Sequence, residues 1–448
     1  MANARWSSRL TFIMASAGAA VGLGNIWRFP YITGQSGGAA FVVVYIICML
    51  VLGIPLIMAE TIVGRHARRN PADAYGQIAL ENKRSSLWQG IGLLGILASF
   101  LVLSYYVVIS GWVLDYVYHS ILSEFQPTPL ITSAQAFDKY LANPWQMLLS
   151  DTIIIGSMIF VVTRGIKEGL EKTIYILFPM LASLLFILLI YALRTGHFIE
   201  ALSFLFKPDV DKINGKTILV ALGQTFFSLN VGFTTIVAYG SYLKDEISII
   251  KTSIIIAVID TAVSLLSGLV IFPVVFSNHL APDSGVSLIF KTIPLAFSSM
   301  PFGNIFASLF FSMVLIAAFT SVIALLEPLV MLLNERLDWS RKKSAMIAGT
   351  CMWLLSFLTI GSFNVIKTFK IFGMTLFENI DFLTSNIMLP IGGLFVALFL
   401  GWRVKKTLAF EQLKLTDKSF LFRAWYFTIR YIAPISILLI LLSSIGLM

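Results

Sequence analysis

Residues 22–30, Gly-Leu-Gly-Asn-Ile-Trp-Arg-Phe-Pro, interrupt a hydrophobic stretch with groups that a membrane-spanning helix normally avoids. The flanking segments, 10–21 and 41–56, are apolar enough to lie in a lipid bilayer. Backbone that leaves the helix at membrane depth still needs hydrogen-bond partners, and it is tolerated where it lines a cavity for a solute or an ion. A glycine kink filled by a neighbouring helix is the alternative. Asn25 and Arg28 favour a functional site, because polar groups inside membranes are costly.

The composition indicates a helical membrane protein with many spans. Hydrophobic residues make up 58% of the chain and charged residues 12%, and the mean hydropathy is +0.87. These values lie outside the range of soluble globular domains. The apolar–polar alternation of β-barrel strands is not evident. Apolar runs of about twenty residues predict eleven transmembrane helices at 10–36, 39–64, 88–121, 148–163, 173–193, 218–241, 249–276, 303–333, 344–361, 377–402 and 424–447.

The distribution of Lys and Arg predicts how the chain is oriented. With a cytoplasmic N-terminus, most basic residues fall in cytoplasmic segments, as the positive-inside rule requires. The net charge of +9 therefore reports orientation, and we expect no nucleic-acid partner. An odd number of helices places the C-terminus outside. We expect a multi-pass protein of the cell inner (plasma) membrane, whose partners are the lipid bilayer and a small molecule.

A second interruption occurs at 226–233, inside the sixth predicted helix and about two hundred residues after the first. Broken helices at corresponding places in two halves are typical of transporters with inverted repeats and a binding site at the bilayer midplane. We therefore expect an all-α membrane protein with a five-plus-five inverted repeat, in which helices 1 and 6 are discontinuous. The expected domain is 1–448, with one repeat over 7–195, the other over 218–403, and a peripheral helix at 424–447.

Several motifs follow one another in a characteristic order. They are GLGNIWRFP at 22–30, GIPL at 53–56 with Glu60, Tyr105-Tyr106 before Gly111-Trp112, the break at 226–233, SGLVIF at 267–272, and Thr320-Ser321 before Glu327-Pro328. Together they resemble the neurotransmitter:sodium symporter family over nearly the whole chain. Eleven helices instead of twelve resemble its shorter bacterial branch, which includes transporters of leucine and other hydrophobic amino acids. The missing twelfth helix leaves the oligomeric state open.

The resemblance implies two sodium sites, built from the oxygen ligands that hard cations prefer. In the first site the substrate carboxylate would complete the coordination, which would couple ion binding to substrate binding. Its protein ligands would be Ala20, Asn25, Ser228 and Asp260. The ligands of the second site would be Gly18, Val21, Ala317, Thr320 and Ser321. A Thr-Ser pair on a helix commonly bonds only to its own preceding turn, which is the alternative for Thr320 and Ser321.

The resemblance also implies an α-amino acid held by its two charged ends. The N–H groups of Leu23 and Gly24 would face the carboxylate at the positive end of a half-helix. Tyr106 would add a hydrogen bond, and the carbonyls of Ala20 and Phe227, with Ser228, would accept from the ammonium group. Family members that carry monoamines have an aspartate where this chain has Gly22, so an amino acid is favoured over an amine.

An apolar pocket is expected around the substrate side chain. Its lining would be Val102, Tyr106, Phe227, Phe233, Ser321 and Leu325, with Asn230 and Ala19 nearby. Such a lining favours a hydrophobic or aromatic amino acid, since a charged side chain would lose its hydration there. Apolar residues at helical spacing are also common in ordinary cores, and the neighbouring breaks favour a site. Which amino acid binds stays open, because one methylene changes discrimination only about ten- to two-hundred-fold.

Asp260 departs from the family pattern, which has asparagine at this position. Chloride-dependent members hold the anion with a tyrosine, a glutamine and two serines, and the matching residues here are Tyr45, Gln224, Ser228 and Ser264. A fixed carboxylate beside two sodium ions would offset their repulsion as a bound anion does. We therefore predict transport without chloride. The alternative is that Asp260 only ligates sodium and that chloride still binds.

Charge pairs that form and break would gate the site from both sides. Arg28 and Asp381 match the outer gate of the family. The inner gate is matched by Trp6, Tyr242 and Glu335, whereas Asn3 stands at its arginine position and Arg5, two residues later, is the candidate replacement. Two further acids, Glu60 and Glu327, are expected to satisfy exposed backbone rather than to move protons.

The expected function is sodium-coupled symport of a hydrophobic or aromatic amino acid, with two sodium ions and no enzymatic activity. The alternative is a membrane sensor of the same fold that binds the amino acid without moving it. Gates on both faces argue against a sensor, which needs no inner exit. An intramembrane enzyme would need a nucleophile–base pair or a metal cluster, and the four histidines, expected at helix ends or in loops, argue against one.

Overall fold

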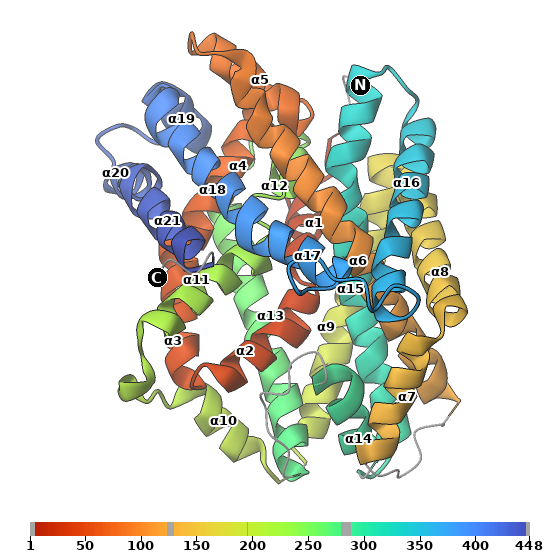
Figure 1. The fold of residues 1–448 in the computed structure, drawn as a ribbon. Coiled ribbons are helices and arrows are strands. Elements are labelled where there is room, and N and C mark those ends of the chain that lie inside the picture. Colours follow the sequence, from red (N-terminus) through yellow and green to blue (C-terminus); the bar gives the residue numbers. More distant parts are fainter. Residues whose placement is uncertain (1–4, 123–129, 195, 279–287, 299, 445–448) are drawn as a thin grey trace.

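Long helices packed side by side form the whole described part of the protein (Figure 1). The computed structural model describes residues 5–122, 130–194, 196–278, 288–298 and 300–444. The N-terminus, α5 and α19 lie at one end of the bundle, here called the N-terminal face, and α10 and α14 lie at the opposite end. No strand longer than the isolated bridge between Ile371 and Met374 occurs in these residues. The expected all-α fold is confirmed.

Local sequence signals place the helix starts. Ser8 caps α1 in a reciprocal capping box with Thr11, and Asn214 caps α11 by accepting from the Thr217 N–H. Up to the second interruption the helices are α1 Arg9–Ala20, η1 Gly24–Arg28, α2 Phe29–Gln35, α3 Ala39–Cys48, η2 Met49–Gly53, α4 Ile54–Ala67, α5 Pro71–Glu81, η3 Ser86–Gln89, α6 Gly90–Ile121, α7 Leu130–Ala142, α8 Pro144–Thr163, η4 Ile166–Glu171, α9 Lys172–Ala192, α10 Phe198–Phe206, η5 Val210–Lys212 and α11 Gly215–Ser228.

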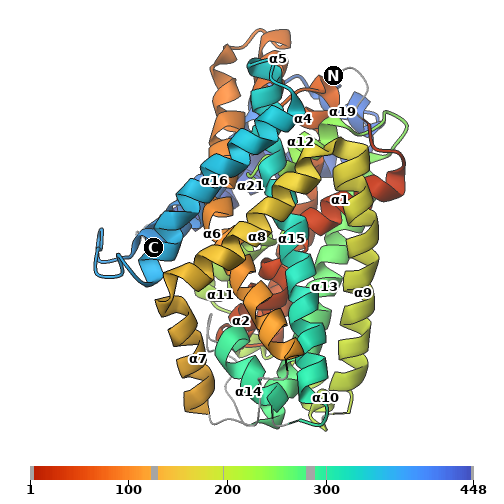
Figure 2. The ribbon, with the colours of Figure 1, turned by 90° about the vertical axis from the view of Figure 1, so that its right-hand side faces the viewer.

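The second half repeats the alternation of long helices with short connectors. Its helices are α12 Thr235–Ser241, α13 Ile249–Ser277, η6 Leu288–Thr292, α14 Ile293–Ser298, α15 Gly303–Arg336, α16 Arg341–Phe363, α17 Leu376–Phe382, η7 Leu383–Met388, α18 Leu389–Leu398, η8 Phe399–Arg403, α19 Lys406–Leu413, α20 Phe420–Phe427, η9 Thr428–Ile432 and α21 Ala433–Ser444. Figure 2 shows α9, α13 and α15 running along the bundle while α8 and α16 cross it obliquely.

Nine helices among the described residues are long and apolar enough to cross a membrane. The count is ten when Arg9–Ala20 and Gly24–Gln35, which meet at a bend of 53°, are taken as one broken span. The predicted sixth span, 218–241, is divided between the short helices α11 and α12, so neither piece meets the length criterion. The count of eleven therefore stays a prediction, and residues 445–447 of the last predicted helix lie outside the described residues.

Close helix contacts hold α12 against α4 beneath the second break. A Cβ added at Gly64 of α4 would lie 2.0 Å from the carbonyl oxygen of Val237 in α12, so only glycine permits this approach. A Cβ added at Gly240 of α12 would likewise lie 3.2 Å from the carbonyl oxygen of Thr61 in α4. Side chains at both positions would push α12 away. The glycines therefore set where the second half of the broken sixth segment lies.

Candidate functional site

The first predicted break is present, and the sequence around it holds it open. Helix α1 ends at Ala20, and Val21 is extended with φ −71° and ψ 107°. The Gly22 carbonyl then accepts from the N–H groups of Asn25 and Ile26, which start the π-helical turn η1. The Asn25 side-chain oxygen accepts from the Gly22 N–H at 3.0 Å. The Asn25 side chain thus accepts from a backbone N–H that the break leaves without a helix partner.

The second predicted break is also present, between α11 and α12. Three residues in this short stretch adopt positive φ: Asn230 at 54°, Gly232 at 89° and Thr234 at 60°. Positive φ is costly for residues other than glycine, and such strain concentrates at functional sites. The released Gly232 N–H donates to the Glu60 carboxylate at 2.8 Å. The expectation that Glu60 satisfies exposed backbone is confirmed.

Side chains bind the two breaks to each other. The Asn230 side-chain nitrogen donates to the Ala19 carbonyl at 2.6 Å, and Gln224 donates to the Gly24 carbonyl at 2.9 Å. The Ser321 hydroxyl, from α15, donates to the Ala19 carbonyl at 3.1 Å. Exposed carbonyls of the first break are therefore met by polar groups from the sixth and eighth predicted helices. All of these groups are buried.

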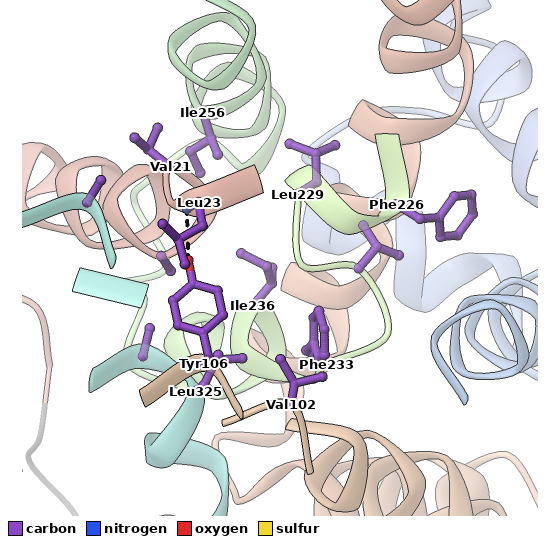
Figure 3. Packing of buried hydrophobic residues seen from close by; sticks show 14 of the residues in the cluster. Val21, Leu23, Val102, Tyr106, Phe226, Leu229, Phe233, Ile236, Ile256 and Leu325 are labelled. Atoms are coloured by element: carbon purple, nitrogen blue, oxygen red, sulfur yellow. Dashed lines mark hydrogen bonds between the residues drawn. The ribbon is translucent and has the colours of Figure 1, made fainter. Parts of the chain in front are cut away.

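A small pocket lies between the breaks, and most of the predicted substrate residues line it. Figure 3 shows Val102, Tyr106, Phe233 and Leu325 around the same space, with the Leu23 N–H donating to the Tyr106 hydroxyl at 2.9 Å. The pocket measures about 10 Å³, room for roughly one water molecule. An amino acid would therefore need the lining to move. The full lining is Ala19, Ala20, Gly22, Gly24, Val102, Tyr106, Phe227, Asn230, Phe233, Ser321 and Leu325.

Three of the four predicted ligands of the first sodium site, Asn25, Ser228 and Asp260, form one buried cluster, and the fourth, Ala20, lines the pocket. The Asp260 carboxylate accepts from Asn25 Nδ2 at 2.8 Å and from the Ser228 hydroxyl at 2.7 Å. The Tyr45 hydroxyl donates to its second oxygen at 3.1 Å. Asn25 Nδ2 also donates to the Ser264 hydroxyl at 2.9 Å. The amide nitrogen of Asn25, rather than the expected oxygen, faces the cluster, so sodium ligation by that oxygen requires the amide to rotate.

The predicted ligands of the second sodium site also lie together, where α15 faces the end of α1. The Ser321 hydroxyl is within hydrogen-bonding distance of the carbonyls of Val21 at 3.4 Å and Ala317 at 3.3 Å. Thr320 donates to the Ala317 carbonyl at 3.0 Å. Gly18 faces the Thr320 side chain across the interface. Thr320 and Ser321 both bond to the preceding turn of their own helix, as the alternative interpretation predicted, but Ser321 also bonds to carbonyls of the first break.

A cavity of about 310 Å³ borders the pocket and holds the residues of the predicted outer gate. Arg28 and Asp381 both line it, together with Tyr106 and Phe227, which also line the central pocket. The Arg28 guanidinium lies 4.2 Å from the centre of the Phe227 ring. Within the described residues Arg28 and Asp381 do not form an ion pair. The two predicted gate residues therefore line one cavity in this conformation without forming an ion pair.

The N-terminal face is closed by direct contacts beneath the pocket. Trp6 is fully buried, donates its ring N–H to the Tyr239 carbonyl at 3.0 Å and packs edge-on against Tyr239 and Tyr242. The Tyr242 hydroxyl donates to Glu327 at 2.9 Å. The Arg341 guanidinium binds both oxygens of Glu327, at 2.9 and 2.6 Å. This network seals the N-terminal face, while the cavity that holds Arg28 and Asp381 reaches Tyr106 and Phe227.

Two expectations about the inner gate differ from the structure. Glu327 binds the side chains of Arg341 and Tyr242, not exposed backbone, so the expectation for Glu327 was wrong. The predicted gate acid, Glu335, accepts from the backbone and side-chain nitrogens of Asn70, both at 2.8 Å, and among the described residues it forms no hydrogen bond with Tyr242. Arg5 is exposed and forms no ion pair with any described residue. Its gating role stays a prediction.

A sequence model described as the sodium:neurotransmitter symporter family matches residues 3–129 and 125–448, which together cover nearly all of the chain. The chain belongs to this family. It is 34% identical over 99% of its length to the uncharacterized sodium-dependent transporter YhdH of Bacillus subtilis, covering 98% of that protein. An uncharacterized sodium-dependent transporter of Haemophilus influenzae is 33% identical, with 98% of both chains covered.

The fold is also similar to a solved structure. The crystal structure of MhsT in complex with L-phenylalanine matches with a TM-score of 0.90 and 38% identity, over 99% of this chain and 100% of that chain. The described helices, with their two breaks, therefore have the architecture of a sodium-dependent membrane transporter of this family.

Sequence analysis missed two residues of the inner network in this symporter. Arg341 stands in the run Arg-Lys-Lys at 341–343, which looked like an ordinary cytoplasmic charge cluster. Tyr239, one helical turn before Tyr242, falls outside the motifs that carry the resemblance. A buried acid in a membrane span requires a partner. Applied to Glu327, this rule predicts an ion pair with one of the nearby arginines. Only the packing of α16 against α15 identifies Arg341 as that partner.

Proposed function

We propose that this protein imports a hydrophobic or aromatic α-amino acid together with two sodium ions, by alternating access around the pocket between the two breaks. The observation that carries the proposal is the meeting of the breaks at Asn25, Ser228 and Asp260. Oxygen groups suited to alkali ions lie there directly beside an apolar pocket. An ion and the carboxylate of a zwitterion would share this location, and each would strengthen binding of the other.

The pocket chemistry supports an amino acid over an amine. A Cβ added at Gly22 would lie 2.4 Å from the Tyr106 hydroxyl and 2.6 Å from the Ser321 hydroxyl, so no acidic side chain fits there to replace a substrate carboxylate. Val102, Phe233 and Leu325 provide an apolar wall, and all three are nearly fully buried. L-Phenylalanine is the compound bound in the solved MhsT structure. An aromatic or large aliphatic side chain is therefore the substrate class that we propose.

Transport without chloride is the second part of the proposal. Hydroxyls of Tyr45 and Ser228, at positions where chloride-dependent relatives hold the anion, donate to the Asp260 carboxylate instead. The carboxylate supplies a fixed negative charge, and its three hydrogen bonds hold it in place. A mobile anion would be redundant at this position.

Gating and membrane placement complete the proposal. The repeats would be 7–195 and 218–403, with a cytoplasmic N-terminus in the inner (plasma) membrane and the C-terminus outside. Opening the N-terminal face would require Trp6, Tyr242, Glu327 and Arg341 to separate, while Arg28 and Asp381 close over the substrate. Residues 1–448 would act as a single transport domain.

The test is uptake of radiolabelled L-phenylalanine and L-leucine into proteoliposomes under an inward sodium gradient. We expect accumulation above equilibrium, lost when choline replaces sodium and unchanged when gluconate replaces chloride. Unlabelled phenylalanine should compete, whereas phenethylamine, which lacks the carboxylate, and aspartate should not. Sodium-dependent binding without accumulation would identify a sensor and refute transport. A large loss of uptake in gluconate would refute chloride independence alone.

A further inference from the structure

A second polar surface lies away from the transport site, where η8, α19 and η9 meet at the N-terminal face. Figure 1 shows α19 and α20, which precedes η9, at the same upper corner of the bundle. We call this the basic aromatic surface, because it contains four cationic and four aromatic side chains. Its members are Arg84, Trp88, Trp402, Arg403, Lys406, Tyr426, Arg430 and Tyr431.

Arg430 is the centre of this surface and belongs to the candidate membrane span Phe420–Ser444. Its guanidinium lies 4.3 Å from the Trp402 ring centre, 5.5 Å from that of Tyr431 and 5.9 Å from that of Tyr426. The Trp402 ring N–H donates to the Arg430 carbonyl at 2.9 Å, which places Arg430 level with the end of the span Leu376–Arg403. Arg430 therefore lies near the membrane boundary.

The aromatic rings around Arg430 do not replace an anionic partner. Its buried Nε has no hydrogen-bond partner, and no carboxylate of the described residues forms an ion pair with it. A guanidinium at membrane depth is costly unless an acceptor meets it. Phosphate groups of lipids occupy this depth, and arginine binds them through two parallel hydrogen bonds. The described protein groups around Arg430 thus lack an anionic acceptor, and the phosphate of a lipid headgroup is such an acceptor.

The other cations converge on the same place from three segments. Lys406 lies 5.2 Å from the Tyr426 ring centre, and Arg403 lies 6.0 Å from that of Trp88. Arg84, from the connector after α5, donates to the Arg403 carbonyl at 3.3 Å. None of these three forms an ion pair with a described carboxylate. On the same face, by contrast, Arg68, Arg336 and Arg341 pair with Asp245, Asp73 and Glu327.

We propose that the basic aromatic surface binds the headgroup of an anionic phospholipid in the leaflet on the N-terminal face. The phosphate would be taken by Arg430 with Arg403 and Lys406. The acyl chains would lie along the exposed side chains below, of which Phe427 is 55% and Tyr431 40% exposed. Exposed Trp and Tyr are typical of the membrane interface, and basic clusters between helices there recognise anionic headgroups. The proposal does not depend on which substrate is transported.

Native mass spectrometry of the purified protein tests the proposal. The protein in detergent is mixed with equal amounts of phosphatidylglycerol and phosphatidylcholine of the same acyl chains. We expect preferential retention of phosphatidylglycerol, weakened about fivefold for each cation removed in Arg403→Gln and Lys406→Gln. Arg430→Lys should retain part of the preference, and Arg430→Gln should lose it. If Arg430→Gln does not fold, the two exposed positions still decide the question.

The matched control is Arg164→Gln. Arg164 also lies over an aromatic ring, 3.9 Å from the centre of Phe160, but outside the basic aromatic surface. It should leave the preference unchanged. A second competition uses glycerol phosphate, which carries the phosphate without acyl chains and should not displace the lipid at equal concentration. Equal retention of both lipids, an unchanged preference in the Arg403→Gln/Lys406→Gln double variant, or displacement by glycerol phosphate would each overturn the proposal.

Discussion

Substitution of Asp260 by Asn tests the central electrostatic argument. The carboxylate is fully buried and accepts hydrogen bonds from Asn25, Ser228 and Tyr45 at 2.8, 2.7 and 3.1 Å. Asparagine has nearly the same shape but no charge, and its NH₂ group cannot accept. At least one of the three bonds must therefore break or reverse, and the two that remain lose their charged acceptor.

The expected loss follows from these contacts. Asp260 is itself a predicted sodium ligand, so removing its charge weakens the attraction for sodium and, through coupling, for the amino acid. An interaction with a charged group is worth roughly 1.5–3 kcal/mol, which corresponds to about a 10- to 100-fold loss of affinity. The removed charge also stops offsetting the sodium ions. Added chloride should restore part of the activity, because the hydroxyls of Tyr45, Ser228 and Ser264 then have an anion to bind. The variant should therefore depend on chloride where the parent protein does not.

The assay is sodium-driven uptake of phenylalanine in chloride and in gluconate, with each variant compared to itself in the two anions. Asp151→Asn is the matched control. Asp151 is another fully buried aspartate in a candidate span, bonded to Ser356 at 2.7 Å but outside the transport site. It should show no chloride effect. The reasoning fails if Asp260→Asn transports equally well in gluconate, or if Asp151→Asn is stimulated by chloride to the same extent.

Three further outcomes are expected. Gly22→Ala would place a Cβ 2.4 Å from the Tyr106 hydroxyl; it should abolish the sodium-dependent thermal shift by phenylalanine, and a normal shift would contradict the pocket geometry. Glu60→Gln keeps an acceptor for the Gly232 N–H and should retain uptake, whereas Glu60→Ala should lower the free energy of unfolding by about 1–3 kcal/mol, measured by chemical denaturation. Glu327→Gln leaves the partly buried Arg341 without its charged partner and should cost about 3 kcal/mol in the same measurement, while Arg5→Gln, on an exposed residue, should change nothing.

Local chemistry in the sequence predicted the two breaks and the residues around them. Glycines, Asn25 and Arg28 within an apolar run signal interrupted helix, because hydrocarbon offers the backbone no other hydrogen-bond partner. Glu60 was correctly expected to satisfy that backbone. The family resemblance pointed to Tyr106, to Ser321 and to the position of Asp260, and the structure places all three at the junction of the breaks.

The tertiary structure decided which distant charges meet. Arg341 and Glu327 are fourteen residues apart on different helices, and only the packing of α16 on α15 forms their ion pair. The same holds for the Asn25 amide, whose nitrogen faces Asp260, for Glu335 on Asn70, and for Arg430 among its three aromatic rings. Hydrophobic pattern and backbone chemistry act over a few residues and can be recognised along the chain. Which side chains become partners depends on how whole helices cross and how far each is shifted along its neighbour. A local sequence pattern carries no information about either.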